Sequence, residues 1–600
     1  NNANNPEGSA RYMVERRHND IQEGMLNINY RNTSVDHLTA TVGLEAKGSQ
    51  GIHYKSVDDL LGGNQWIDVD PFAERDIKEL ATNIGMTQED INNVKQNNLA
   101  NPNAAITTGG RFGYDYRINM MNAKLWAQNE WNWNEVDLYY ALQFTYSSMQ
   151  RTTNMVNGRA WYLARLNPDY AQYYLGSQAQ NVLDGNYPAA GSALVGYAHH
   201  FIDPAFKIGA TYKINGRNQL KVNAMAETKA PLARDAYISP RVHDRAIEAI
   251  YRHDQAAAYA KRDGTSWLHE YFGASQKMAS ADLTYSFNYP VVRGRITGFY
   301  TQFWDGTELN GYYDDEARTF VNQALTGIDR RHMGIEAAAA VKLGLYFTLT
   351  GVVSVGDYRY TSNAYSITSA ENGMALAENV DGAIYELRDS VLINGLRVAT
   401  GPQVNTSLKL SFFHPKMWFA DITVSYFDWS YLDYAPSRRM KGLYTGVRAD
   451  GSAVNGWYGS KESPNGGAKG PDAIVKDENG NVVYDKYGIP TLKAPYNQLA
   501  DQEMLTDAQW YNRFLVDVSV GKLIYLKNRQ SISINLTVNN LLNNTRFKTG
   551  GYQQARLPRG TYQRTDDNSN SVITSNVWKF PSKYYYAWGT NFYLNIQYKF

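Results

Sequence analysis

The chain ends in a segment whose side chains alternate between an apolar and a largely polar face. A period of two predicts a β-strand. Aliphatic residues occupy the centre of the apolar face and aromatic residues its ends, as expected for a strand that faces lipid, since Trp and Tyr rings settle at membrane interfaces. We therefore predict a strand that closes a membrane β-barrel, with its apolar face formed by Trp588, Phe592, Leu594, Ile596, Tyr598 and Phe600.

The same alternation recurs upstream in hairpins. Seven short turns are expected, at residues 32–34, 132–134, 215–218, 290, 343–344, 414–415 and 527–528. With the closing strand, these hairpins give about fifteen strands. Long polar connections join them at the other end, at residues 50–111, 151–203, 229–277, 357–401 and 432–507. Short turns on one side and long loops on the other are typical of a transmembrane antiparallel β-barrel with periplasmic turns and extracellular loops.

Both strands of one hairpin are expected to direct their apolar side chains outward. This hairpin turns at residues 215–218, and its outward residues are Phe206, Ile208, Ala210 and Tyr212 on one strand and Leu220, Val222, Ala224 and Ala226 on the other.

Residues 1–600 are predicted to form a single barrel domain. Residues 1–21 are expected to be the remnant of an extracellular loop, and residues 22–600 the strands and loops of the barrel. Bacterial single-chain barrels have an even number of strands, so an odd count indicates that opening strands lie before Asn1. The chain begins without Met or a signal peptide, which indicates processing or truncation.

Composition excludes several other classes of protein. No run of about 18 apolar residues is present, so a membrane protein built from helices is excluded. The mean hydropathy of −0.50 is compatible with a barrel, whose strands face lipid with only every second side chain. The absence of Cys excludes disulfides and thiolate metal sites. A net charge of +1 gives no basic excess, so nucleic acid is not expected as a partner.

The sequence contains no catalytic motif, and we predict no enzyme activity, no metal and no cofactor. Two weak metal-site candidates have simpler explanations. Asp68, Asp70, Glu74 and Asp76, weighed as Ca²⁺ ligands, fit an acidic loop before a helix. His199 and His200 with Asp203, weighed for a transition metal, are adjacent strand residues that point to opposite faces.

Aromatic side chains in the long loops are the remaining site candidates. Aromatic rings stack on sugars and pack against peptides, so these side chains are candidates to line a substrate vestibule. About half of such aromatics are expected instead at the membrane interface, where the strands end. The substrate-binding candidates are Trp304, Tyr312, Tyr313, Trp429, Tyr431 and Trp457.

Several motifs resemble a known family, the TonB-dependent outer-membrane receptors of the Bacteroidetes type, which include SusC-like relatives. The resemblance covers essentially the whole chain, although its motifs are architectural and identify no substrate. The C-terminal barrel wall of the family is matched by Asn539-Asn540-Leu541-Leu542-Asn543, by Lys579-Phe580-Pro581-Ser582-Lys583-Tyr584-Tyr585-Tyr586 and by the strand that ends in Phe600. Further matches are Ala230-Pro231-Leu232-Ala233-Arg234-Asp235-Ala236-Tyr237-Ile238-Ser239-Pro240-Arg241, Gly334-Ile335-Glu336 and Ser354-Val355-Gly356-Asp357.

The resemblance implies a full protein with a 22-stranded barrel in the outer membrane of a Gram-negative bacterium. It also implies an N-terminal plug and opening strands that this chain lacks. The implied activity is import of a large or scarce ligand (a glycan, a peptide or a chelated metal) by displacement of the plug. The implied partners are outer-membrane lipids, the TonB-ExbB-ExbD complex through the plug, and a surface lipoprotein or other outer-membrane subunits. The alternative function is a receptor-like barrel that serves as a structural subunit of an outer-membrane assembly or secretion complex.

Overall fold

The structure is a computed structural model. It describes residues 8–71, 73–75, 86–166, 168, 171–189, 192–237, 275–315, 319–370, 377–379, 382–384, 386–399, 401–441, 477–481, 483, 502–556, 559–565, 572–578 and 580–600.

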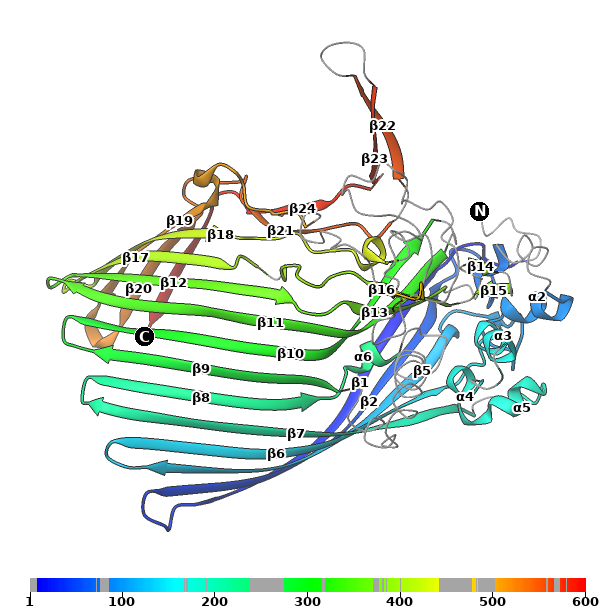
Figure 1. The fold of residues 1–600 in the computed structure, drawn as a ribbon, viewed down its shortest axis with the longest axis horizontal. Coiled ribbons are helices and arrows are strands. Elements are labelled where there is room, and N and C mark those ends of the chain that lie inside the picture. Colours follow the sequence, from blue (N-terminus) through cyan, green and yellow to red (C-terminus); the bar gives the residue numbers. More distant parts are fainter. Residues whose placement is uncertain are drawn as a thin grey trace.

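One antiparallel sheet of 17 strands dominates the described residues (Figure 1). Two of its strands, β13 (Ala364–Ala370) and β16 (Glu386–Val391), extend only the loop end of β11. The other fifteen form a continuous wall: β1 Val14–Asn32, β2 Leu38–Asp59, β5 Arg111–Asn132, β6 Val136–Thr153, β7 Leu194–Asn215, β8 Asn218–Lys229, β9 Gln276–Asn288, β10 Val292–Asp314, β11 Thr319–Leu343, β12 Phe347–Tyr360, β17 Val404–His414, β18 Trp418–Asp428, β19 Phe514–Tyr525, β20 Ser531–Asn539 and β25 Asn591–Lys599.

The wall is a meander, because each wall strand pairs with the wall strand that follows it in the chain. Each of the seven predicted short turns falls between two paired strands, and the turns gather at one end of the sheet (Figure 1). The predicted fold class is therefore confirmed, as is the expectation of about fifteen strands. Within the described residues, β1 pairs only with β2 and β25 only with β20, so this sheet has two free edges.

The registers place apolar side chains of neighbouring strands on one surface. In the hairpin of β7 and β8, the predicted sharing of a face is confirmed by four pairs: Phe206 with Ala226, Ile208 with Ala224, Ala210 with Val222 and Tyr212 with Leu220. The same surface continues to the last strand, where Leu536 lies opposite Leu594. Large side chains on it are exposed, as Ile596 is at 63%. We call this surface the apolar face and the opposite surface the polar face.

The predicted closing strand has the expected alternation. Four of its apolar residues lie opposite apolar residues of β20: Phe592 with Val538, Leu594 with Leu536, Ile596 with Ile534 and Tyr598 with Ile532. Trp588 precedes the strand and Phe600 follows it, and both are almost fully exposed. The role of β25 in closing a barrel stays a prediction, since its second edge is unpaired in the described residues.

The predicted boundary of the first loop is wrong. Strand β1 already begins at Val14, whereas residues 1–21 were expected to be loop. Residues 14–21 pair with the last residues of β2, up to Asp59. Apolar alternation is weak there because the segment includes His18, Asn19 and Asp20. Backbone hydrogen bonds to β2 therefore extend β1 into residues 14–21, where the side chains do not alternate between apolar and polar.

The connections opposite the turns carry most of the remaining elements, and we call this the loop end (Figure 1). Its helices are α2 Gln88–Val94, α3 Gly158–Leu166, α4 Ala171–Leu175, η3 Gly176–Gln178, α5 Ala179–Leu183, α6 Ala233–Ala236, η5 Pro436–Arg439 and η7 Trp510–Arg513. Its small strands are β3 Trp66–Ile67, β4 Ala105–Ile106, β14 Ala377–Asn379, β15 Gly382–Ile384, β21 Lys548–Tyr552, β22 Arg559–Thr565, β23 Val572–Trp578 and β24 Lys583–Tyr586. One further 3₁₀ turn, η8 Lys527–Arg529, lies at the turn end. Among the helices that the structure describes, none is both long and apolar enough to cross a membrane.

Local chemistry explains the helix α2. Thr87 and Asp90 form a capping box, in which each side chain binds the backbone N–H of the other. The helix packs with α3, α4 and α5 around buried residues that include Trp161, Tyr174 and Val182. This cluster gives the loops around β5–β7 a hydrophobic core of their own.

The Asn-rich motif that follows β20 fixes the last loop to the sheet. The Asn540 amide donates to the carbonyl oxygens of Asn544 and Trp588, at 3.1 and 2.8 Å. The Asn544 amide donates to the carbonyl oxygens of Asn512 and Phe514, both at 2.9 Å. Residues beside β19, β20 and β25 are thereby tied together, which gives this motif an architectural role.

Candidate functional site at the loop end

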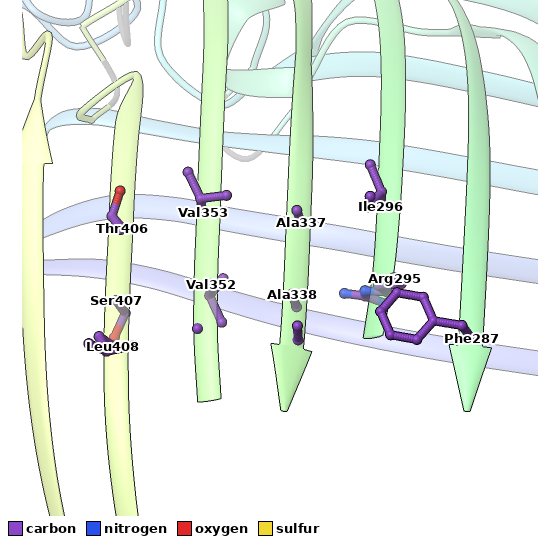
Figure 2. Close-up of a pocket in the computed structure, with 12 residues that line it drawn as sticks. Phe287, Arg295, Ile296, Ala337, Ala338, Val352, Val353, Thr406, Ser407 and Leu408 are labelled. Atoms are coloured by element: carbon purple, nitrogen blue, oxygen red, sulfur yellow. The ribbon is translucent and has the colours of Figure 1, made fainter. Parts of the chain in front are cut away.

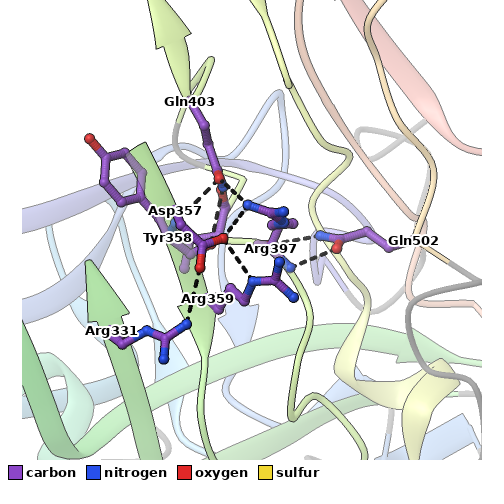
Figure 3. Close-up of polar contacts among 8 residues, drawn as sticks. Arg331, Asp357, Tyr358, Arg359, Arg397, Gln403 and Gln502 are labelled. Carbon is purple, nitrogen blue, oxygen red and sulfur yellow. Dashed lines mark hydrogen bonds and ion pairs between the residues drawn. The ribbon is translucent and has the colours of Figure 1, made fainter. Parts of the chain in front are cut away.

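Three arginines form a row across the loop end of the sheet (Figure 3). Arg331 of β11 lies opposite Arg359 of β12, and Arg359 lies opposite Arg397, in the segment between β16 and β17. Residues directly opposite each other in antiparallel strands project from the same face. Val355 and its cross-strand partner Ile335 are exposed residues of the apolar face. Arg359 lies four residues after Val355 and therefore projects from the same face, so the row belongs to the apolar face. We call these three residues the arginine row.

The guanidinium groups of the arginine row converge on one carboxylate, that of Asp357 (Figure 3). Arg331 Nη2 is 3.0 Å and Arg359 Nε 2.8 Å from its oxygens, and Arg397 Nη1 contacts it as well. No second carboxylate lies within ion-pair distance of any of the three in the part of the chain that the structure describes. The cluster therefore carries two positive charges in excess. The side chains of Arg331 and Arg359 remain 32% and 30% exposed.

Two glutamines and two aromatic rings hold Arg397 in place. Gln502 accepts the backbone N–H of Arg397 at 2.7 Å and donates to its carbonyl oxygen at 2.6 Å. Gln403, which is buried, accepts from Arg397 Nη1 at 2.9 Å. The Arg397 guanidinium also lies 5.9 Å from the ring centre of Trp429 and 5.6 Å from that of Tyr431. These contacts restrict the rotamers of Arg397 and make the row rigid at that end.

A second aromatic and arginine cluster joins two loops that are distant in sequence. Arg556 pairs with Asp315 beyond the end of β10, with its Nε 2.9 Å from the carboxylate. The same guanidinium lies 3.7 Å from the ring centre of Phe580 and 5.9 Å from that of Tyr313. Tyr313 in turn packs edge-on against Phe320 of β11.

The structure separates the six predicted loop aromatics into groups. Trp429 and Tyr431 lie together beside Arg397, and Tyr313 lies beside Arg556. Tyr312 is buried, so its ring is covered by protein. Trp457 lies outside the described residues.

Trp304 belongs to neither cluster. It is opposite Lys277 of β9, on the apolar face, and its side chain is 38% exposed. That position suits a ring at a membrane interface better than a ring that contacts a ligand. The interface role is the one expected for about half of the loop aromatics.

Three groups at the loop end have raised pKa values. A hydrogen bond of 2.6 Å from the Tyr584 hydroxyl to Glu503, together with burial, raises the pKa of Tyr584 to about 12. Burial raises the pKa of the Asp433 carboxyl, although the backbone N–H of Tyr434 partly opposes this. Burial also raises the pKa of Tyr434 well above its usual range. Burial and local hydrogen bonds explain the raised pKa of each group, which is consistent with a structural role.

The carboxylates weighed as calcium ligands interact with protein donors. Asp68 accepts from the Asn97 amide at 2.8 Å and from the backbone N–H of Gly113 at 3.0 Å. Asp70 forms a buried ion pair with Arg159. Asp76 is not among the described residues.

The two adjacent histidines diverge, as expected for neighbours in a strand. His199 is buried with its ring edge-on to Tyr237, and His200 hydrogen-bonds the Tyr146 hydroxyl at 2.8 Å. Among the described residues no group of three or more His, Cys, Asp or Glu side chains is arranged to hold a metal ion.

Sequence reasoning missed the arginine row. Its members are separated by 28 and 38 residues, and only the register of β11 with β12 brings the first two together. One signal was present, because the family-like segments Gly334-Ile335-Glu336 and Ser354-Val355-Gly356-Asp357 prove to be cross-strand partners, with Gly334 opposite Gly356. Asp357 closes the second of these segments.

No known family's sequence model matches the chain, and no curated protein sequence matches it. Solved structures similar to it include the copper transporter OprC, with 10% identity and a TM-score of 0.43, over 97% of this chain and 57% of that one. The ferric yersiniabactin uptake receptor FyuA from Yersinia pestis has 9% identity and a TM-score of 0.44, over 97% and 54%. The siderophore receptor PiuA from Acinetobacter baumannii has 9% identity and a TM-score of 0.41, over 97% and 56%. The chain thus spans a little over half the length of these structures, and we base its function on its own residues.

Proposed function

We propose that this chain forms the wall and extracellular loops of a TonB-dependent outer-membrane transporter, related to the SusC-like receptors, that imports a large or scarce ligand. The observation that carries the proposal is the exposed apolar face, which runs across the whole antiparallel wall between a short-turn end and a long-loop end. Soluble monomers rarely expose contiguous apolar patches of more than a few hundred square ångströms. A bilayer is the environment in which such a face is stable.

In this proposal, the ligand binds at the loop end and passes through the lumen when a plug is displaced. The plug would be supplied by sequence outside this chain and would connect it to the TonB-ExbB-ExbD complex. The ligand is a glycan, a peptide or a chelated metal, as the family resemblance implies, and the loop aromatics suit the first two. Of the predicted aromatics, Trp429, Tyr431 and Tyr313 are the best placed, since each lies at the loop end and none is fully buried. A surface lipoprotein partner belongs to the same proposal.

The first experiment tests insertion into a membrane. The full-length protein, extracted in detergent, is expected to migrate faster on a gel when unheated than when boiled, and to float with phospholipid vesicles in a density gradient. A protein that is soluble without detergent and does not float would overturn the proposal.

The second experiment tests transport. Uptake of a labelled glycan, peptide and ferric chelate is compared in cells with and without an intact TonB complex, and uptake of one of them is expected to require it. Trp429→Ala with Tyr431→Ala should raise the half-saturating concentration about 5- to 150-fold, since two aromatic contacts are lost and each is worth about 0.5–1.5 kcal/mol. Trp418→Ala, at the turn end beside Lys522, is the matched control and should have no effect. An inserted barrel that imports none of the three, and copurifies with other outer-membrane subunits, would favour the structural role instead.

A further inference from the structure

We propose that the apolar face binds one membrane lipid with an anionic phosphate headgroup, with an acyl chain in a groove across β9–β12 and β17 and the phosphate at Arg331 and Arg359. This inference rests on the proposed function, because it requires that the apolar face lie against a bilayer. It adds a lipid site on the apolar face, whose phosphate end adjoins the aromatics of the ligand site through Arg397.

The groove has a volume of about 450 Å³ and is almost entirely apolar (Figure 2). Small residues lie at its centre, where Ala339 of β11 and Gly351 of β12 are directly opposite each other. Larger side chains of neighbouring strands surround them: Phe287, Ile296, Val353 and Leu408. Missing side-chain volume at the centre therefore creates a concave site on an otherwise even surface. Arg295, Thr406 and Ser407 also line the groove, but nearly all of its surface is apolar, so it fits a hydrocarbon chain better than a polar ligand.

The arginine row lies on the same face, closer to the loop end. Asp357, on which its guanidinium groups converge, is four residues beyond Val353 of the groove. At about 3.3 Å per residue this separates the charged cluster from the groove by roughly 13 Å along the strand. Val355 of β12 and Ile335 of β11 fill the interval, and both are exposed and apolar. A continuous apolar path thus leads from the groove to the charged cluster.

Aromatic residues mark the level of the row as a membrane interface. Gln302 of β10 lies opposite Arg331, and Tyr300 and Trp304 flank Gln302 on the same face of the strand. Their side chains are 47% and 38% exposed. Tyr and Trp rings prefer the headgroup region. The arginines are therefore placed at the depth where lipid phosphates lie.

Charge selects the headgroup. Three arginines share one aspartate, so an anion is favoured, and guanidinium groups bind phosphate oxygens through paired N–H donors. Asp357 holds the guanidinium groups together, and the partial exposure of Arg331 and Arg359 leaves donors available to a ligand. Arg397 is the most constrained of the three and acts as a positioning residue.

The test uses the full-length protein in nanodiscs that contain phosphatidylcholine with a minor fraction of phosphatidylglycerol. After extraction into mild detergent, native mass spectrometry counts the lipids that remain bound. The expected result is one retained phosphatidylglycerol per protein. Arg331→Gln with Arg359→Gln should lower its retention at least about tenfold, because two charge-assisted contacts are lost. Arg16→Gln with Arg17→Gln is the charge-matched control, since both are exposed arginines on β1, paired with Asp58 and Glu15.

The groove is tested separately by Gly351→Leu. A Cβ at Gly351 would contact only Leu408 Cδ1, at 3.8 Å, so the new side chain fits and fills the groove. Retention of phosphatidylglycerol should fall while that of phosphatidylcholine stays low. Gly48→Leu, on the apolar face of β2 where a Cβ has no neighbour within 4 Å, is the volume-matched control and should retain the lipid.

Several results would overturn the inference. Equal retention of the two lipids would remove the role of charge, and unchanged retention in Gly351→Leu would remove the groove. Full displacement by inorganic phosphate, with no effect of Gly351→Leu, would indicate a free-anion site instead. A wild-type protein that floats with vesicles yet retains no lipid would overturn this inference alone, whereas failure to float would overturn the proposed function as well.

Discussion

The turn end and the loop end of the sheet are stabilised by different means. At the turn end, each short turn is held by local bonds: the Asn215 side chain accepts the backbone N–H groups of Arg217 and Asn218, both at 2.9 Å, and Leu345 is 91% exposed. The pairs that join neighbouring hairpins there, such as Asp137 with Lys213, are partly exposed. At the loop end, contacts join segments far apart in the chain, such as the buried ion pair of Asp70 with Arg159. The difference teaches that the turn end is specified by short sequences, whereas the loop end depends on tertiary packing.

The two ends should differ most in the stability that is lost when an ion pair is broken. Asp70→Ala leaves the Arg159 guanidinium, which is 3% exposed, buried opposite an apolar group. We expect a loss of about 3–5 kcal/mol in the local stability of the loop-end helices, read from amide hydrogen exchange across residues 158–166. Asp137→Ala, which breaks the partly exposed pair with Lys213 at the turn end, should cost less than about 1 kcal/mol. Equal costs would contradict the comparison.

The second-largest loss of stability is expected at the loop end, in the Asn-rich motif that follows β20. Asn540 is buried, has a positive φ of 48° and makes the two hydrogen bonds described above, and its side-chain oxygen also accepts the Asn544 N–H. Asn540→Ala should cost about 2–3 kcal/mol, measured as faster exchange of the amides near Thr590. Asn540→Gly tolerates the same φ but lacks the hydrogen bonds. If Asn540→Gly kept the wild-type protection of the amides near Thr590, the side-chain hydrogen bonds of Asn540 would not contribute to stability.

A smaller effect is expected at the turn end. Gly344, between β11 and β12, has a φ of 72°, and a Cβ there would meet no atom within 4 Å. Gly344→Ala should therefore cost about 1 kcal/mol from backbone strain alone, seen as a lower midpoint in denaturant titration. Gly216, in the turn between β7 and β8, has equal space but no positive φ, and Gly216→Ala should leave the midpoint nearly unchanged. A drop of equal size in both variants would assign the cost to something other than φ.

The smallest effect concerns pH. The raised pKa of Tyr584, about 12, means that the folded state holds this proton more tightly than an unfolded chain, in which Tyr titrates near 10. The hydrogen bond to Glu503 therefore stabilises the loop fully below about pH 10 and is lost as the pH rises toward 12. Tyrosine-labelled NMR should place the titration of Tyr584 near pH 12, and Glu503→Gln should lower it. Titration at the ordinary value in the wild-type protein would sink this prediction.

The sequence was sufficient to predict the wall. The alternation of apolar and polar residues depends only on the two-residue period of a strand and on the presence of one apolar face. Leu594 and Ile596 of β25, which lie opposite Leu536 and Ile534 of β20, are an example. Short turns were found because Asn, Gly and Pro mark them locally, as at Gly344. The same logic placed only part of β1, since polar residues near His18 hide a strand that is held by pairing alone.

For the loop end, the sequence predicted which types of residue are present but not how the loops pack. Helix α3 and its cluster were not expected, because Gly158–Leu166 is short and is stabilised by packing against α2, α4 and α5. Aromatic content pointed to Trp429 and Tyr431 but also to the buried Tyr312, since sequence does not reveal which loops cover which rings. The arginine row could be found only from the register of the strands. The groove could be found only by placing two small residues opposite each other, Ala339 of β11 and Gly351 of β12.

The meander order of the wall makes the hairpin its unit of change. Because each strand pairs with its successor, removing a hairpin such as β7–β8 would bring β6 next to β9, two strands that run in opposite directions. The remaining strands would keep their directions, so turns would stay with turns and loops with loops, and every side chain would keep its face. A sheet of this kind can therefore change its circumference in steps of two strands, by duplication or loss of a hairpin, without redesign of the strands that remain.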